Sequence, residues 1–219
     1  MKIFLQARVN SKRFPKKVLK EIYKKKNSLE VIIDKISKIG YKNDLVVLTS
    51  NKKSDNLIKT FCKKKKINCF RGPLDNVALR FLRALKKYKC NYFMRISADS
   101  PLIDIRLIKK AMKYVKENKY QIITNVCPRS FPKGQSVEII KSSVYKDNYA
   151  NFNKKKYLEH VTNFFYKNKK NFLIKNIKSK KDYSNFSLAL DTKKDFNKIK
   201  NLLFLSNNVD RNFFDYLKV

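Results

Sequence analysis

The chain has 219 residues, 43% of them hydrophobic, and it carries a formal net charge of +36 at pH 7. The length is usual for one α/β domain, and the hydrophobic fraction argues against a disordered chain. Because its apolar runs are far shorter than a membrane-spanning helix and its N-terminus does not read as a secretory signal, we expect a single cytoplasmic domain over residues 1–219, with no membrane contact.

The positive charge comes mostly from lysine and is spread along the whole chain. A charge of this size, taken alone, suggests nucleic acid or another polyanion as a partner. A nucleic-acid groove more often favours arginine and concentrates its charge, whereas abundant lysine with only 3 glycines indicates a coding bias. Nucleic acid is therefore not the expected partner. Against this lysine background, several arginines lie in or beside the polar segments described below: Arg8, Arg13, Arg71, Arg80, Arg95 and Arg129.

Hydrophobic runs and helix signals alternate through the first half of the chain. The predicted strands cover residues 3–6, 45–48, 67–70, 92–96 and 121–124. The predicted helices run from residue 28 to Gly40, from 54 to 66, from an N-cap at Asp75 to 85, and from 105 to 116. Strands that alternate with helices imply a parallel sheet with right-handed crossovers.

The second half of the chain is less regular. We expect strands over residues 137–140, 172–177 and 187–190, and helices over residues 157–166 and 193–203. No change in composition calls for a second domain. The four cysteines have the spacing of neither a CxxC pair nor a zinc ribbon, so we expect reduced thiols.

Three polar segments leave the carboxyl ends of the predicted strands: residues 7–17, 71–75 and 97–104. Ligands of open α/β sheets bind beyond these strand ends. The first segment offers Arg8, Arg13, Lys17 and the hydroxyl of Ser11, which together can bind a triphosphate. It is not a P-loop, because the GxxxxGK[ST] pattern is absent. The alternative is a basic surface turn.

Two acids stand directly after predicted strands. Asp99 and Asp191 could share one Mg²⁺ at the same sheet edge and hold it against phosphate oxygens. The alternative for Asp191 is an N-cap of the last helix, which is also the expected role of Asp104. Two weaker candidates for an acceptor pocket follow. The turn containing Pro132, Gly134 and Glu138 could equally be a plain turn, and the helix carrying Glu159 and His160 could simply pack.

Six segments resemble, in order, the motifs of one family: LQARVNSKRFPKKVL, FRGPLDNVALRF, RISADSPLID, FPKGQSVEII, LEHVT and LALDT. The family is that of the cytidylyltransferases related to spore coat polysaccharide biosynthesis protein F and, more distantly, to the acylneuraminate and deoxy-octulosonate cytidylyltransferases. The resemblance extends from about residue 1 to residue 204. It implies a Rossmann-like α/β fold with a mostly parallel sheet of the nucleotide-diphospho-sugar transferase (glycosyltransferase-A) type, and it suggests a homodimer.

The resemblance also implies an activity, in which CTP or another nucleoside triphosphate reacts with a sugar or sugar acid and Mg²⁺ is the cofactor. The residues carried over as catalytic are Arg8, Arg13, Lys17 and Asp99, and the metal ligands are Asp99 and Asp191. The nucleotide-binding residues carried over are Leu5, Gln6, Ala7, Arg8, Ser11, Arg13, Lys17, Asp75, Arg80, Arg95, Ser97 and Ala98. The acceptor-binding residues carried over are Pro132, Gly134, Glu138, Glu159 and His160.

The chain departs from the family pattern at four positions. Asn10, Lys16 and Ala98 stand where the family usually has glycine, and Ser136 replaces an acid. The acceptor and the base preference therefore stay open. One alternative is nucleotidyl transfer to a sugar phosphate or polyol phosphate. Another, of a different class, is a protein that binds RNA or another polyanion, or an inactive partner, on the same fold.

Overall fold

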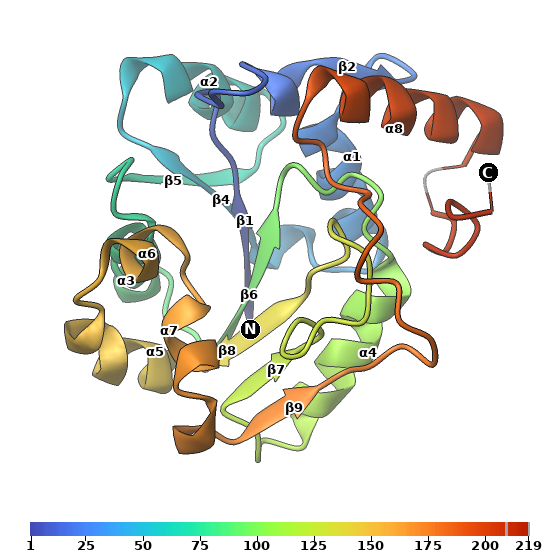
Figure 1. Ribbon diagram of the computed structural model, residues 1–219. Helices are drawn as coiled ribbons and strands as arrows, with labels where there is room; N and C mark the ends of the chain where they lie inside the picture. Colours follow the sequence, from blue (N-terminus) through green and yellow to red (C-terminus); the bar gives the residue numbers. More distant parts are fainter. Residues whose placement is uncertain (209, 219) are drawn as a thin grey trace.

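The structure is a computed structural model that describes residues 1–208 and 210–218. Its main strands are β1 (Lys2–Gln6), β4 (Leu45–Ser50), β5 (Asn68–Gly72), β6 (Tyr92–Ser97), β7 (Ile122–Thr124), β8 (Glu138–Lys141) and β9 (Ile174–Asn176). They form one seven-stranded sheet in the order β5-β4-β1-β6-β8-β7-β9 (Figure 1). Only β8 runs antiparallel to its two neighbours in this sheet. The predicted α/β fold with a mostly parallel sheet is confirmed.

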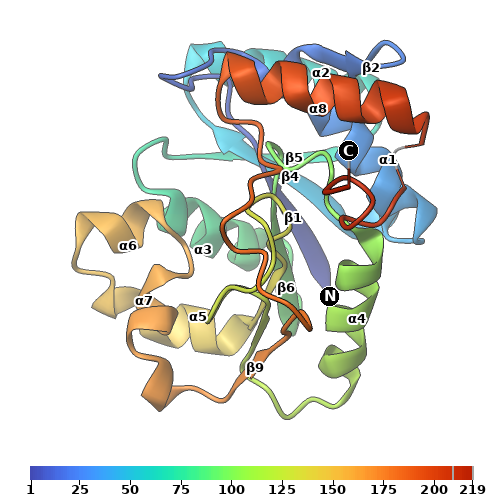
Figure 2. The same cartoon turned by 45° about the vertical axis from the view of Figure 1, so that its right-hand side comes forward.

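Helices cover both faces of the sheet (Figure 2). The α-helices are α1 (Ser28–Lys38), α2 (Asn56–Lys64), α3 (Val77–Lys87), α4 (Ile105–Lys116), α5 (Ser142–Asn148), α6 (Lys155–Glu159), α7 (Asn163–Lys167) and α8 (Lys193–Ser206). Short 3₁₀ turns lie at Lys17–Leu19, Lys42–Asp44, Lys53–Asp55, Tyr149–Asn151 and Lys169–Asn171. A small hairpin of β2 (Glu21–Tyr23) and β3 (Lys26–Asn27) lies against α8.

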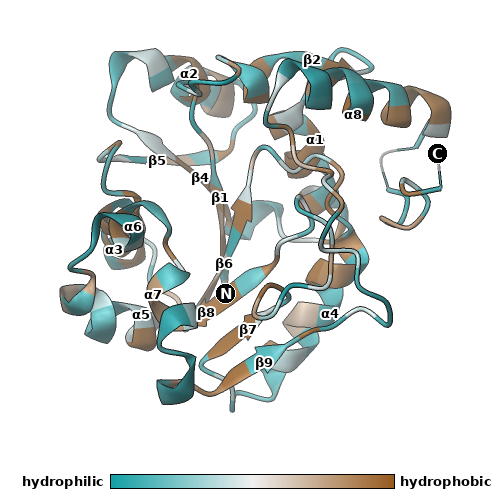
Figure 3. Ribbon diagram, viewed as in Figure 1, coloured by the Kyte–Doolittle hydropathy of each residue, from teal (hydrophilic) through white to brown (hydrophobic). Residues whose placement is uncertain are grey.

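Alternating side chains of the strands divide the core into two layers. In β1, Ile3 and Leu5 join the layer of α1, α2, α4 and α8, whereas Phe4 joins the layer of α3 and α5 to α7. All three side chains are fully buried. Much of the hydrophobic colour in Figure 3 accordingly lies on the central strands. A sheet buried on both faces explains why its strands read as continuous apolar runs.

Helix ends agree with the sequence at some positions and differ at others. Gly40 follows α1 with φ +86°, and the Asp104 side chain caps α4 by accepting the Arg106 N–H at 2.8 Å. The prediction that Asp75 caps α3 is wrong. Asn76 is the N-cap, because its side-chain oxygen accepts the Leu79 N–H at 2.7 Å.

The second half departs further from the sequence-based expectations. Residues 187–190 form no strand, because only a single bridge links Ser187 to Lys133. The helix expected over residues 157–166 is split into α6 and α7, and between them Thr162 bonds to Glu138 in β8. Helix α5 and the β2–β3 hairpin were not predicted.

Two further sequence-based expectations concern the state of the cysteines and the absence of a membrane-spanning helix. All four cysteines are free within the part of the chain that the structure describes. None of its helices there is long and apolar enough to span a membrane.

Candidate functional site

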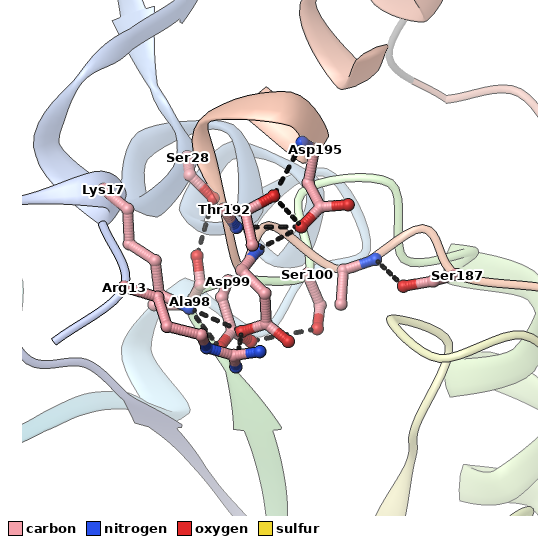
Figure 4. A network of polar contacts seen from close by, with 11 residues as sticks. Arg13, Lys17, Ser28, Ala98, Asp99, Ser100, Ser187, Thr192 and Asp195 are labelled. Carbon is pink, nitrogen blue, oxygen red and sulfur yellow. Dashed lines mark hydrogen bonds and ion pairs between the residues drawn. The ribbon is translucent and has the colours of Figure 1, made fainter. Parts of the chain in front are cut away.

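Four charged side chains from three distant segments meet beyond the carboxyl end of β6. The Lys17 ammonium lies 3.1 Å from the Asp99 carboxylate and 3.0 Å from the Asp191 carboxylate. The Arg13 guanidinium lies 3.0 Å from the same oxygen of Asp191. Figure 4 shows Arg13 and Lys17 directed toward Asp99 from the first loop. Of the three polar segments predicted to converge, residues 7–17 and 97–104 therefore meet in this cluster, and Asp191 joins them; residues 71–75 contribute no side chain to it.

Asp191 is available to this cluster because other residues cap α8. Thr192 is the N-cap, and its hydroxyl accepts the Asp195 N–H at 3.2 Å. The Asp195 carboxylate in turn accepts the N–H groups of Thr192 at 2.8 Å and Asp191 at 3.2 Å. This capping box satisfies the helix end without the Asp191 side chain, so the alternative role of Asp191 as an N-cap does not hold.

Backbone contacts hold Asp191 beside Asp99. The Leu190 N–H donates to the Asp99 carbonyl at 2.7 Å, and the Leu188 N–H donates to the Lys133 carbonyl at 2.8 Å. Gly134 allows this approach, since a Cβ there would lie 2.6 Å from the Leu188 carbonyl group, and its φ is +91°. The turn predicted to line an acceptor pocket thus supports the extended segment that ends at Asp191.

A buried carboxylate anchors the first loop. Asp55 accepts the N–H of Val9 at 2.7 Å and the N–H of Ser50 at 3.0 Å. Its position before α2 resembles a helix start, so this tertiary role could not be predicted from local pattern. Lys16, at a position where the resemblance implies glycine, adopts φ 58°, a left-handed conformation that glycine adopts most readily. The next residue, Lys17, is buried, and its ammonium reaches the two acids.

The charges in the cluster govern the ionisation of Asp191. Burial opposes its ionisation, but hydrogen bonds and charge from Lys17 and Arg13 outweigh burial, so the pKa of Asp191 lies below its ordinary value. Arg13, Lys17, Asp99 and Asp191 together carry no net charge when all four are ionised. When a polyphosphate with a divalent cation binds here, the phosphates can pair with the two basic side chains and the cation with the two carboxylates, so no charge is left unpaired.

A second polar network joins β1, β6 and β8. Arg95 donates to the Gln6 side chain at 3.2 Å and pairs with Glu138. Glu138 also accepts hydroxyl hydrogens from Thr162 at 2.7 Å and Tyr166 at 2.8 Å. Burial raises the pKa of Glu138, but the charge of Arg95 and these hydrogen bonds outweigh it and lower the pKa. Thr162 lies in the LEHVT segment but was not among the candidate site residues, and Tyr166 was not singled out from the sequence.

Arg80 stands apart from the charged cluster and is almost completely buried. Its Nε and Nη2 donate to the Pro73 carbonyl at 3.1 and 2.8 Å, and Nη2 also reaches the Leu74 carbonyl at 3.3 Å. Gly72 makes room for its stem, since a Cβ there would lie 2.8 Å from the Arg80 Cγ. Arg80 therefore fixes the loop after β5, in which Asp75 is exposed.

The remaining predicted site residues lie in several places. Leu5, Ala7 and Ala98 are buried at the ends of β1 and β6, Gln6 pairs with Ser97 in the sheet, and Arg8 is exposed on the first loop with Ser11 partly buried beyond it. Pro132 is buried in the turn before β8, and Glu159 and His160 are exposed where α6 ends.

The donor set at the cluster fits Mg²⁺. No group of three or more His, Cys, Asp and Glu side chains lies together among residues 1–208 and 210–218. Two carboxylates, Asp99 and Asp191, do converge on one ammonium. Mg²⁺ in nucleotide sites is usually bound by one or two carboxylates plus phosphate oxygens and water, so two acids suffice.

Comparison with known proteins gives a family match. A family model described as cytidylyltransferase matches residues 3–214. The chain is 32% identical over 194 residues to an uncharacterised protein of Methanocaldococcus jannaschii, covering 88% of this chain and 78% of that protein. It is 24% identical over 210 residues to the spore coat polysaccharide biosynthesis protein SpsF of Bacillus subtilis, covering 90% of this chain and 84% of SpsF.

Solved structures share the fold. A cytidylyltransferase from Leptospira borgpetersenii matches with a TM-score of 0.92 and 23% identity, over 99% of this chain and 92% of that chain. A CMP:2-keto-3-deoxy-manno-octonic acid synthetase complexed with CTP matches with a TM-score of 0.71 and 13% identity, over 94% of this chain and 98% of that chain. At these identities the likeness establishes the fold alone.

Proposed function

The chain belongs to the cytidylyltransferase family, and from that premise we propose that it transfers the cytidylyl group of CTP to a hydroxyl of a sugar or sugar acid, with Mg²⁺ held by Asp99 and Asp191. The observation that carries the proposal is the convergence of these two acids, from distant segments, on the single ammonium of Lys17. A charged arrangement of this kind at the carboxyl ends of parallel strands suits a polyphosphate with a divalent cation.

In the proposed reaction the acceptor oxygen forms a bond to the α-phosphorus of CTP. The bond from that phosphorus to the oxygen bridging to the β-phosphate breaks, and pyrophosphate leaves with the electron pair. The hydroxyl proton passes to solvent. Lys17 and Arg13 approach the two acids from the first loop and supply the positive charge that stabilises the departing pyrophosphate. Mg²⁺, when bound, supplies Lewis-acid polarisation of phosphate oxygens.

The chain's own residues would position the nucleotide in two ways. Asp55 holds the first loop by accepting the Val9 N–H, which fixes the start of the segment that carries Arg13 and Lys17. Arg80 holds the carbonyls of Pro73 and Leu74, which fixes the loop that leaves β5. The sugar or sugar-acid acceptor is proposed by analogy with the relatives, since SpsF is named for polysaccharide biosynthesis and the octonic acid synthetase for its product.

The test is release of pyrophosphate from CTP, UTP, ATP and GTP with Mg²⁺, across a panel of sugars, sugar acids, sugar phosphates and polyol phosphates. Release from CTP with one acceptor is expected, and Asp99→Asn should abolish it. Asp147→Asn, at an exposed acid on α5, is the matched control and should behave as the unchanged protein does. If no nucleotide releases pyrophosphate with any acceptor, the proposal fails.

A further inference from the structure

Arg129, on the loop between β7 and β8, is a partly buried cation that donates hydrogen bonds to neutral groups. Its Nη2 donates to the Ser136 hydroxyl at 3.1 Å, and its Nη1 makes a long contact to the Pro132 carbonyl at 3.4 Å. No ion pair to Arg129 occurs within the described part of the chain. A guanidinium has five N–H donors, so most of its donors remain for a ligand.

The carboxylate that influences Arg129 is already engaged elsewhere. Glu138 is paired with Arg95 and accepts hydroxyl hydrogens from Thr162 and Tyr166. Burial lowers the pKa of Arg129, and the charge of Glu138 opposes this only in part. The positive charge of Arg129 is therefore partly desolvated without being paired, which is an unfavourable arrangement for a group with a purely structural role.

The loop that carries Arg129 is bonded to both segments that carry the proposed metal ligands. The Gln135 side chain accepts the Asp104 N–H at 2.8 Å and donates to the Leu102 carbonyl at 2.7 Å, just after Asp99. The same loop accepts the Leu188 N–H at Lys133, just before Asp191. These bonds fix the loop at the same edge of the sheet as the charged cluster.

We propose that Arg129 binds an anionic group of the acceptor, a carboxylate or a phosphate, so that the substrate class is a sugar acid or a sugar or polyol phosphate. The planar guanidinium matches either anion with two parallel hydrogen bonds. The proposal rests on the proposed function for its setting, since it concerns the second substrate of that reaction. The inference assigns to Arg129 the selection of charged acceptors over neutral sugars.

The binding test uses α,β-methylene CTP, whose P–C–P link cannot be cleaved, so that acceptors bind without turnover. The probes are 2-keto-3-deoxy-manno-octonic acid for a carboxylate, glycerol 3-phosphate and glucose 1-phosphate for a phosphate, and N-acetylglucosamine as the neutral sugar. Each probe is titrated calorimetrically with Mg²⁺, with and without the nucleotide analogue. A carboxylate or a phosphate probe is expected to bind, and which one binds identifies the source of the anion.

Arg129→Gln is expected to weaken binding of that anionic probe about 100-fold, because a charge-assisted pair is lost, and to leave affinity for the nucleotide analogue unchanged. Arg129→Lys should recover part of the loss. Arg83→Gln removes an exposed arginine from α3 and controls for net charge, so it should bind every probe as the unchanged protein does. Ser136→Asp places a carboxylate beside the guanidinium and should weaken the anionic probe while preserving the fold.

Two results would overturn the inference: an anionic probe that binds Arg129→Gln or Ser136→Asp as tightly as the unchanged protein, or anionic probes that bind the unchanged protein no better than N-acetylglucosamine. A purely structural brace predicts the first result, together with a lower melting temperature for Arg129→Gln. Failure of the nucleotide analogue to bind would refute the proposed function alone. The titrations without nucleotide would still compare the affinities of the unchanged protein and Arg129→Gln for the anionic probe, and so would still test the inference.

Discussion

Replacing Lys17 with methionine removes the cation that joins the two acids while keeping most of the side-chain volume. Lys17 makes one contact to Asp99 and one to Asp191, at 3.1 and 3.0 Å, and its side chain is only 8% exposed. Hydrogen bonds to charged groups contribute about 1.5–3 kcal/mol each. The carboxylates are 28% and 36% exposed, so solvent screening reduces the sum to roughly 2 kcal/mol.

For a chain of this size that loss corresponds to a fall in melting temperature of about 4–8 °C without ligands. Lys17→Met should also raise the pKa of Asp191, because burial raises this pKa and Lys17 is one of the two groups that lower it. Mg²⁺ alone should then stabilise the variant more than the unchanged protein, since Asp99 has lost its ion pair and Asp191 keeps only the one with Arg13. Pyrophosphate release should fall about 100- to 1,000-fold through loss of charge stabilisation.

The assay is thermal unfolding with and without Mg²⁺, followed by pyrophosphate release. Lys12→Met, at an exposed position of the same loop, is the control for loss of one charge. The reasoning about the cluster is refuted if Lys17→Met melts at the same temperature as the Lys12→Met control and responds to Mg²⁺ no more strongly.

Three other predictions address the supports of the site and the core. Gly134→Ala should lower the free energy of unfolding, measured by chemical denaturation, by at least about 3 kcal/mol, because its Cβ would clash with Leu188 and its φ is positive. Gly40→Ala has a positive φ but no neighbour within 4 Å, so it should cost only about 1–2 kcal/mol. Equal losses in the two variants would contradict the role of Gly134. Arg80→Lys should lower the free energy of unfolding by about 2 kcal/mol, because hydrogen bonds to the carbonyls of Pro73 and Leu74 are lost. The variant should also have a higher KM for CTP. An unchanged KM would show that this loop does not contribute to nucleotide binding. Burial lowers the pKa of Lys35 from 10.5 to about 8, so between these pH values the folded state binds fewer protons than the unfolded chain. The free energy of unfolding of the unchanged protein, relative to that of Lys35→Met, should therefore rise with pH across this window by up to about 3 kcal/mol. A difference that stays flat or falls would contradict the assignment.

The sequence alone was enough to predict the alternating half of the fold. Continuous apolar runs such as residues 45–48 identify strands covered on both faces, and they occur in the sheet as β4. Asp99 and Asp191 were predicted to meet because both follow apolar runs that end at one sheet edge. The structure brings them together on Lys17, a residue chosen for its charge and its place in the first loop.

What the sequence could not reveal depends on contacts between distant segments. Residues 187–190 have the composition of a strand, but their backbone bonds go to Lys133 on one side and to Asp99 on the other, so no ladder forms. Asp55 looks like a helix start, yet its carboxylate is used by the backbone of Val9. The helix around His160 is interrupted where Thr162 turns toward Glu138. Local pattern carries no information on any of these partners.

A direct test of the two-acid metal site is the thermal shift produced by CTP with and without Mg²⁺, compared between the unchanged protein and Asp99→Asn and Asp191→Asn. Ligand binding to the folded state raises the melting temperature by mass action. We predict a shift with CTP that grows when Mg²⁺ is added, and loss of the Mg²⁺-dependent part in both variants. A shift that is the same with and without Mg²⁺, or that survives unchanged in both variants, would contradict the assignment of Asp99 and Asp191.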